Sequence, residues 1–204
     1  MWVAKIGGSL AGSTTLPAWL AALGADRARR WLLVPGGGPY ADAVRTAQRR
    51  DGFSDAEAHA RAMQAMARYA DDLGALDASF TVCRSLAACA LPGATAVARR
   101  HPAEADVAAL AELPADWRVS SDSLAFAVAA RLDCAGLVLL KSTAPPTLPT
   151  GVVAAAAAAY VDEWLPTLMA GAALPMFWVN ATTPPEIPLN SAAWPPPTQR
   201  MLFS

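Results

Sequence analysis

Lysine is almost missing from this sequence. Only two of its 16 basic residues are lysines, Lys5 and Lys141, and arginine occupies the other 14 positions. Lysine is ordinarily among the commonest residues in proteins. Each of the two ends an apolar run, in "WVAKI" and in "LVLLK". The two lysines stand at these positions either for a chemical reason or by chance, and the motifs around them decide between the two explanations.

A strong net charge and long apolar stretches are missing as well. The formal net charge is −1 and the pI is about 6.1, so the basic footprint of a nucleic-acid-binding protein is absent and we expect no nucleic acid partner. The longest apolar candidate, 151–161, is shorter than the roughly 18–20 residues of a membrane span. The segment "MWVAKIGGSL" has no basic region ahead of a long apolar one. We therefore expect a cytoplasmic protein without a membrane partner.

Cysteine and histidine are too few and too scattered to suggest a disulfide framework or a zinc site. The three cysteines are Cys83, Cys89 and Cys134, an odd number without a C-x-x-C pair, which predicts buried free thiols. Of the two histidines, we expect His59 on the surface of a helix and His101 in a loop. No G-x-S-x-G motif is present, which argues against a hydrolase.

Strand and helix signals alternate along the chain. Bounded apolar runs predict strands at Trp2–Ile6, 30–35, 94–98, Gly136–Lys141 and Met176–Asn180. Start and stop residues predict helices at 16–24 with Gly24 as the stop, from Pro39, after Ser54, from Ser120–Asp122, and at 161–171. This order predicts an α/β fold, a three-layer αβα sandwich with a mostly parallel central sheet, in a single domain over 1–204. Proline-rich residues 182–197 are expected to run as extended surface coil.

The helix expected after Ser54 has two distinguishing features. Ser54 and Glu57 form the S-x-x-E pattern of a capping box. An apolar stripe then recurs at three- and four-residue spacing, which indicates either core packing or a dimer face. Its members are Ala56, Ala60, Met63, Ala67 and Ala70.

Three glycine-rich or polar segments follow predicted strands: 5–9, 36–38 and 141–143. In parallel α/β sheets, ligands collect at the carboxyl ends of the strands. Glycine lets backbone N–H groups approach an anion, and lysine adds a compact point charge suited to phosphate. Each segment alone is more often ordinary turn geometry, and neither glycine turn completes a P-loop or a G-x-G-x-x-G motif. Their combination in order indicates a phosphate-binding edge.

The ordered set "KIGGSL", "VPGGGPYAD", "SSDSLA" and "LVLLKST" resembles the amino acid kinase family, which includes acetylglutamate kinase, aspartokinase and bacterial uridylate kinase. The resemblance covers residues 2–143 and implies a kinase that uses ATP and Mg²⁺. It implies that Lys5 neutralises the transferred phosphoryl group, with the N–H groups of Gly7, Gly8 and Ser9 around that group.

The same resemblance implies roles for the other segments. Gly36, Gly37 and Gly38 would bind the acceptor substrate, and Asp122 would orient the lysines and help to hold Mg²⁺, directly or through water. Lys141, with Ser142 and Thr143, would contact the phosphates of the nucleotide. Phosphoryl transfer needs positioning and charge stabilisation above all, which these residue types supply. Pairing of family members through a helix implies a homodimer or a higher homo-oligomer.

The sequence departs from the family after Lys141. The usual D-V-D-G nucleotide segment is replaced by "APPTLPTG", and no further lysine follows. This leaves a second interpretation, a non-catalytic nucleotide- or ligand-binding regulatory protein on the same fold. A dinucleotide-dependent oxidoreductase is disfavoured because neither glycine turn completes its fingerprint.

Within the family, "WRVSSDSLA" and the later "VDEWLP" resemble a short branch, the kinase of methanofuran-type cofactor synthesis. That resemblance implies aminomethyl-furanmethanol phosphate, a small-molecule acceptor whose phosphate is the attacking group. Asp162 or Glu163 would then meet the ammonium group of this substrate. The alternative is that they only cap the following helix.

Overall fold

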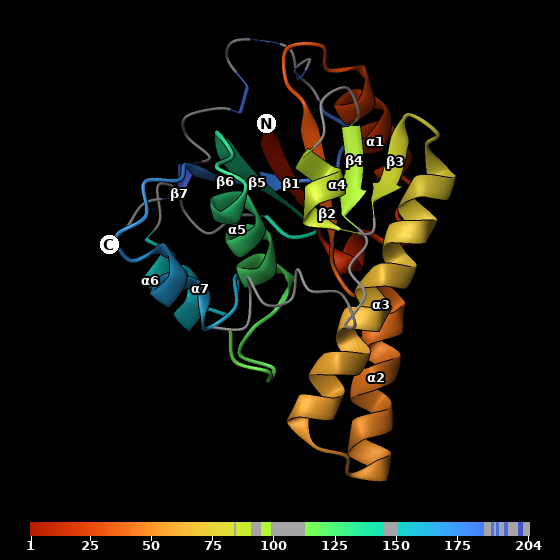
Figure 1. Cartoon of the computed structure of the whole chain (residues 1–204), viewed down its shortest axis with the longest axis vertical. Helices are drawn as coiled ribbons and strands as arrows, with labels where there is room; N and C mark the ends of the chain where they lie inside the picture. The colour runs from red at the N-terminus through yellow and green to blue at the C-terminus, as the bar shows by residue number, and fades with distance from the viewer. Residues whose placement is uncertain are drawn as a thin grey trace.

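The structure is a computed structural model of the whole chain, shown in Figure 1. It describes residues 1–83, 85–90, 95–98, 113–144, 151–185, 189, 191, 194–195 and 200–201. The expectation for His101 therefore lies outside the described residues, as do residues 145–150 of the segment after Lys141 and much of 182–197.

Seven strands form one sheet in the order β3-β4-β2-β1-β5-β6-β7. All neighbouring pairs are parallel except β6 and β7, which are antiparallel. β1 lies in the middle of the sheet, so its carboxyl end is flanked by those of β2 and β5. The strands are β1 (Trp2–Ile6), β2 (Trp31–Pro35), β3 (Phe80–Cys83), β4 (Thr95–Ala98), β5 (Gly136–Lys141), β6 (Met176–Asn180) and β7 (Arg200–Met201).

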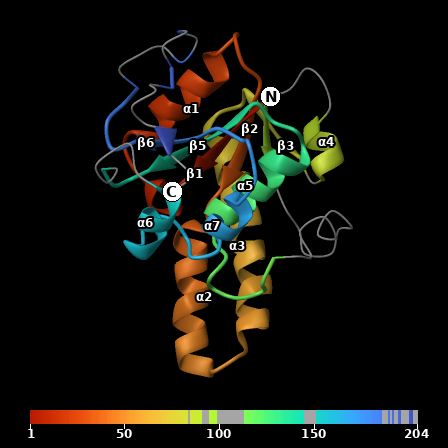
Figure 2. The ribbon, with the colours of Figure 1, turned by 90° about the vertical axis from the view of Figure 1, so that its left-hand side faces the viewer.

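Helices cover both faces of this sheet, as the two views in Figures 1 and 2 show. The predicted three-layer α/β fold is confirmed. The described helices are η1 (Gly8–Leu10, a 3₁₀ turn), α1 (Leu16–Ala25), α2 (Gly38–Asp51), α3 (Asp55–Leu76), α4 (Leu86–Ala90), α5 (Ser121–Arg131), α6 (Val152–Ala157) and α7 (Leu165–Met169).

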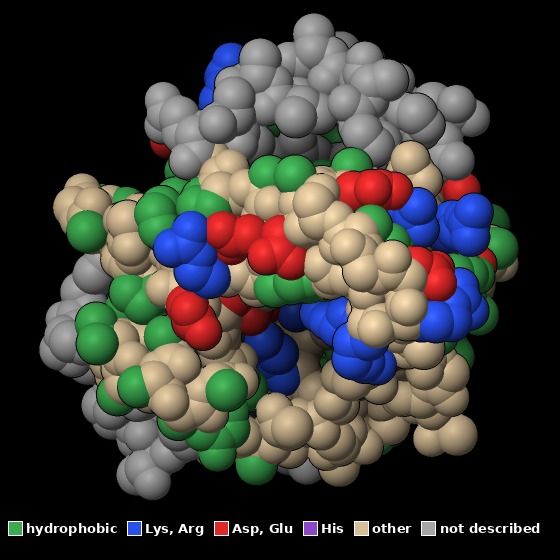
Figure 3. Space-filling model, turned by 90° about the horizontal axis from the view of Figure 1, so that it is seen from below, with side chains coloured by type: hydrophobic (Ala, Val, Ile, Leu, Met, Phe, Trp, Pro, Cys, Tyr) green, Lys and Arg blue, Asp and Glu red, His purple; other side chains and the backbone are tan. Residues whose placement is uncertain are grey.

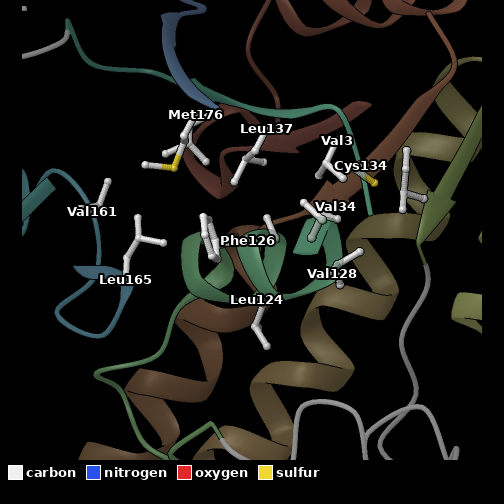
Figure 4. Packing of buried hydrophobic residues seen from close by; sticks show 14 of the residues in the cluster. Val3, Val34, Leu124, Phe126, Val128, Cys134, Leu137, Val161, Leu165 and Met176 are labelled. Carbon is white, nitrogen blue, oxygen red and sulfur yellow. The ribbon is translucent and has the colours of Figure 1, made fainter. Parts of the chain in front are cut away.

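The side chains of each strand alternate between the two faces of the sheet, and helices cover both faces, so the apolar strands are buried on both sides. On β1, Val3 belongs to the cluster that packs against α5 and α7, whereas Ala4 and Ile6 belong to the cluster that packs against α1. Figure 4 shows the first cluster, in which Phe126 of α5 lies between the sheet and the α6–α7 region. Continuous apolar runs thus form strands covered on both sides.

Helices α2 and α3 form a hairpin that projects beyond the sheet (Figures 1 and 2). Gly52 ends α2 in the left-handed conformation with φ 71°, which glycine adopts without the strain of a Cβ atom. Ser54 then caps α3, because its hydroxyl accepts a hydrogen bond from the Glu57 N–H at 3.2 Å. The predicted cap is confirmed, although the Glu57 carboxylate pairs with Arg61.

Several predictions of detail are wrong. Gly24 does not stop α1, which ends at Ala25; a Cβ atom on Gly24 would lie 2.3 Å from the Ser79 hydroxyl, so close packing explains this glycine. Ala56 and Ala60 are exposed because the first turns of α3 bury another face, that of Ala58, although the rest of the stripe is buried.

Two further predictions fail toward the C-terminus. The helix expected over 161–171 is only α7, which begins after Trp164 with Pro166 in its first turn and ends two residues before Gly171, whose φ is 78°. Within the proline-rich tail, Leu189 and Trp194 are 3% and 4% exposed, so these two residues belong to the core instead of the surface. They join the cluster that contains Trp31.

Other sequence-based expectations hold. The strands β1, β5 and β6 have the predicted bounds. Cys83, Cys89 and Cys134 are free and buried. In the described part of the chain, no helix combines the length and the apolar character that a membrane crossing requires.

Candidate active site

Two glycine turns meet at the carboxyl ends of β1 and β2. A Cβ atom on Gly8 would lie 2.6 Å from the backbone nitrogen of Gly38, and one on Gly36 would lie 2.6 Å from that of Gly8. Only glycine permits such an approach of two backbones. Among the described residues, no backbone carbonyl accepts a hydrogen bond from the N–H groups of Gly8, Ser9 or Gly37. Unused N–H donors at the edge of a parallel sheet suit an anion.

Both lysines project from the sheet toward α5. Lys5 lies two residues after Val3 on β1, and Lys141 lies two residues after Leu139 on β5, so each shares the face of an apolar residue in the α5 cluster. The parallel pairing of β1 with β5 brings the two strand ends together. Asp122 stands in the first turn of α5, opposite these ends.

The three residues form a buried ion-pair triad. Lys5 Nζ lies 2.9 Å from Asp122 Oδ1, and Lys141 Nζ lies 2.6 Å from Asp122 Oδ2. Lys141 also donates to the Tyr160 carbonyl at 3.0 Å. Asp122 is only 3% exposed and Lys5 only 5%. The structure therefore brings together the three residues that the sequence singled out as catalytic, with one net positive charge among them.

Burial and charge act against each other in the triad. Burial by itself raises the pKa of the Asp122 carboxyl, but the two lysine charges outweigh it and hold the pKa below its ordinary value. Burial, together with the charge of Lys5, lowers the pKa of Lys141 to about 8, although Asp122 acts in the opposite direction. The site holds an ionised carboxylate beside an ammonium group whose pKa is lowered to about 8.

Asp162 fixes the start of α5 and hence the place of Asp122. Its carboxylate accepts hydrogen bonds from the backbone N–H and the hydroxyl of both Ser120 and Ser123. It also accepts from the N–H groups of Trp164 and Leu165, at the start of α7. All six donors belong to the protein, so the capping interpretation of Asp162 is the one that the structure supports.

A cavity of about 330 Å³ opens beside the triad, between the glycine turns, the α2–α3 hairpin and the start of α5. Lys5, Lys141 and Asp122 lie at its sheet end. Figure 3 shows this end of the molecule hollowed, with Lys and Arg side chains in the hollow and acidic side chains beside it. This volume is in the range of small-molecule sites.

The predicted glycines divide into two groups in this cavity. Gly8, Gly37 and Gly38 line it together with Ser9. Gly7 and Gly36 lie behind them: the Gly7 N–H donates to the Leu140 carbonyl and the Gly36 N–H to the Ile6 carbonyl. These two glycines allow the turns to pack.

The predicted nucleotide residues lie beside the first glycine turn, at the opposite side from the hairpin. The hydroxyls of Ser9 and Ser142 are hydrogen-bonded at 2.5 Å. The Thr143 carbonyl accepts a hydrogen bond from the Trp178 ring N–H at 3.3 Å. The loop after β5 is thereby joined to the turn after β1.

Several cavity residues were not identified as site residues from the sequence, among them Asp42, Arg45, His59 and Trp117. His59 lies on a helix, as expected, and is half-buried in the cavity wall. Arg45 and His59 come from helices that face each other only because the chain turns at Gly52. The sequence signal that points to them is weak, a seven-residue step along α2 from the glycine turn.

No protein-family model matches the sequence, and no curated protein has significant sequence similarity to it. Solved structures establish the fold instead. Uridylate kinase from Archaeoglobus fulgidus has a TM-score of 0.63 at 13% identity, covering 87% of this chain and 89% of its own. Isopentenyl phosphate kinase has a TM-score of 0.56 at 14% identity, covering 90% of this chain and 93% of its own.

A larger protein shares the same fold. Aspartate kinase from Synechocystis has a TM-score of 0.67 at 12% identity, and the match covers 100% of this chain but 40% of that protein. These neighbours have the amino acid kinase fold, so the predicted fold is confirmed. At such low identities the likeness is one of fold.

Proposed function

We propose that this chain is an ATP-dependent kinase that transfers a phosphoryl group to a carboxylate or phosphate of a small molecule. The observation that carries this proposal is the buried triad Lys5–Asp122–Lys141 at the junction of two glycine turns with unused N–H donors. A group of this composition stabilises negative charge that is spread over phosphoryl oxygens.

Each element has a part in this chemistry. The N–H groups of Gly8 and Ser9 would hold phosphoryl oxygens, and the two ammonium groups would neutralise the charge that develops during transfer. Asp122 keeps these ammonium groups in place without covering them on the cavity side, which both lysines line. The acceptor would lie in the cavity between α2 and α3, and the nucleotide on the side of Ser142 and Thr143.

The residues present fit a magnesium ion that is held by phosphate. In the described residues, no group of three or more His, Cys, Asp and Glu side chains forms a metal site. Both Asp122 oxygens already lie beside lysines. Mg²⁺ commonly takes few protein ligands and keeps phosphate oxygens and water. The ion would therefore arrive with the nucleotide and supply charge neutralisation there.

The acceptor is not determined by the fold, since the names of the neighbouring structures specify uridylate, isopentenyl phosphate and aspartate. Aminomethyl-furanmethanol phosphate is one candidate, which rests on the resemblance to the kinase of methanofuran-type cofactor synthesis. Asp162 is not available for the ammonium group of that compound, because protein donors occupy it. We also propose that the chain pairs with itself, which light scattering of the purified protein tests.

The decisive experiment measures Mg-ATP binding by calorimetry and then ADP release with a panel of carboxylates, nucleoside monophosphates and the furan phosphate. We expect the wild type to bind Mg-ATP and Lys5→Ala and Asp122→Asn to lose turnover with the accepted compound. Arg49→Ala is the matched control, because Arg49 is exposed on α2 and outside the cavity lining. Absence of nucleotide binding by the wild type would refute the proposed kinase function.

The second candidate is a ligand-binding regulatory protein without catalysis. It is favoured by one observation, the replacement of the expected nucleotide segment by "APPTLPTG". It predicts that small phosphates bind to the cavity, with a dependence on Lys5, while Mg-ATP does not bind.

A further inference from the structure

The cavity has two chemically different ends along the α2–α3 hairpin. The triad and the glycine turns lie at the sheet end, whereas Arg45, His59 and Trp117 lie toward the tip of the hairpin. Arg45 follows Gly38 by seven residues on α2, a distance of about 10 Å at 1.5 Å per residue. A ligand that reaches from one end to the other is therefore elongated.

The wall between the two ends is mostly apolar. Methionines of α3 and small or branched residues of α2, α5 and the preceding segment form much of it, with Ser120 and Ser121 beside them, so the middle of the ligand is largely apolar. These wall residues are Ala41, Ala62, Met63, Met66, Val119 and Leu124.

Arg45 is held in place by contacts on two sides. Its guanidinium lies 4.6 Å from the centre of the Trp117 ring, and its Nη1 donates to Asp42 Oδ1 at 3.0 Å. Trp117 is fixed in turn, since its ring N–H donates to Gln48 Oε1 at 2.7 Å, and Gln48 donates to Asp55 at 2.7 Å. These contacts restrain the guanidinium, while the Arg45 side chain stays 45% exposed and accessible to a ligand.

Most of the hydrogen-bonding capacity of Arg45 remains for a ligand. A guanidinium has five N–H donors, and among the described residues only the Asp42 carboxylate accepts from Arg45. A planar group of this kind binds carboxylate or phosphate oxygens with two parallel hydrogen bonds. A cationic ligand group would face the like charge of the guanidinium, although Asp42, which accepts from Arg45, also lines the cavity.

We propose that Arg45 is a specificity-determining residue that binds an anionic group at the far end of the acceptor. Resting on the proposed function, this gives the acceptor a carboxylate or phosphate at the triad, a largely apolar body, and a second anionic group at Arg45, which stands about 10 Å along α2 from the glycine turn, the span of seven helical residues. It disfavours acceptors with an ammonium group at that end, the aminomethyl furan phosphate among them.

Three synthetic probes test this assignment without turnover: benzyl phosphate, 4-carboxybenzyl phosphate and 4-(aminomethyl)benzyl phosphate. They share the phosphate and the flat apolar body and differ only in the charge of the distal group. Calorimetry with the wild type is expected to show that the carboxy compound binds about 10- to 100-fold more tightly than benzyl phosphate, and the amino compound more weakly.

The variant Arg45→Leu keeps an apolar stem and should reduce binding of the carboxy compound to the level of benzyl phosphate. Arg49→Leu, which changes an exposed arginine on the same helix, should keep the preference. Circular dichroism and thermal unfolding verify that both variants are folded. A further variant, Trp117→Phe, removes the hydrogen bond to Gln48 and should weaken the preference while Arg45 is still present.

Tightest binding of the amino compound, an unchanged preference in Arg45→Leu, or failure of all three probes to bind would each overturn the inference. The proposed kinase function is tested separately, because it is refuted only if the wild type does not bind Mg-ATP. If the wild type binds Mg-ATP but binds the three probes in the opposite order of affinity, the proposed kinase function stands and the proposed role of Arg45 is rejected.

Discussion

Replacing Asp122 by asparagine removes the carboxylate that lies between two buried ammonium groups. Asparagine keeps the size of the side chain and one neutral oxygen, but the negative charge is gone and an NH₂ group replaces the other oxygen, so Lys5 and Lys141, at 2.9 and 2.6 Å from the two oxygens in the wild type, remain as neighbouring cations. Breaking a buried ion pair by removing one partner costs about 3–5 kcal/mol. We therefore expect the free energy of unfolding of Asp122→Asn to be lower than that of the wild type by about this amount near neutral pH.

The cost should depend on pH, with limits set by both partners. The folded pKa of Asp122 lies below its ordinary value of 3.8, so its stabilisation is present above that value and is lost as the pH falls through the folded pKa. The folded pKa of Lys141 is lowered from 10.5 to about 8 while Asp122 acts to raise it. Without that carboxylate the pKa of Lys141 is lower still, so in the variant the repulsion is relieved by loss of this proton at a lower pH than the wild type loses it. The difference between the two proteins is then largest between these limits.

Urea unfolding of both proteins across a pH series measures this difference. Asp71→Asn serves as the control, since it makes the same chemical change on α3, outside the triad and the cavity. A difference of less than about 1 kcal/mol, the value of an exposed ion pair, or a difference that is the same at every pH, would refute the reasoning about the triad.

Three further outcomes follow from the same geometry. Inorganic phosphate should bind more weakly to the wild type as the pH rises past about 8, where Lys141 loses its proton. In Lys141→Arg the affinity should change less, because arginine stays charged. A wild-type affinity that calorimetry finds independent of pH contradicts this prediction. Gly8→Ala should lose phosphate binding and be destabilised by about 1–3 kcal/mol, because its Cβ atom would lie 2.6 Å from the Gly38 nitrogen; normal thermal stability would exclude the predicted clash. Asp162→Asn should lower the free energy of unfolding, measured in urea, by about 1–3 kcal/mol. The reason is that the amide nitrogen of asparagine cannot accept a hydrogen bond from Ser123. An unchanged urea midpoint would reject the capping role of Asp162.

The sheet and the triad were within reach of sequence reasoning because both depend on short-range patterns. An apolar run bounded by turn residues, such as Trp2–Ile6, has few alternatives to a buried strand. The period of two then fixes the face on which Lys5 points, and the serines before Asp122 mark a helix start. Knowing that parallel strands end at one edge was sufficient to expect Lys5 and Lys141 in proximity, and the resemblance to the amino acid kinase family added Asp122.

The far end of the cavity was not predictable in the same way. Arg45 is one of 14 arginines and Trp117 one of seven tryptophans, and nothing local distinguishes either from a surface residue. Their contact joins α2 to the segment before α5, across more than 70 positions of the chain. Such a contact is determined by tertiary packing, and a pattern among residues adjacent in the sequence carries no information about it.

The proline-rich tail shows a second limit of local patterns. Prolines predict coil, and they give no information on whether the coil is covered. Arg29 donates hydrogen bonds to the carbonyls of Leu189 and Trp194 and lies 5.8 Å from the Trp194 ring. These contacts satisfy the backbone of the tail where it packs on the sheet, so a segment without regular structure is buried at Leu189 and Trp194.

The scarcity of lysine has a physical explanation in this arrangement. Lys5 and Lys141 share one carboxylate within a buried space, where two compact ammonium groups fit and two planar guanidinium groups would need more room and more acceptors. On the proposed assignment, arginine serves the opposite end of the cavity, where Arg45 is spread over the Trp117 ring and binds a group that does not react. Lysine would thus be retained where charge develops during transfer, and arginine would be used where a fixed anion is recognised.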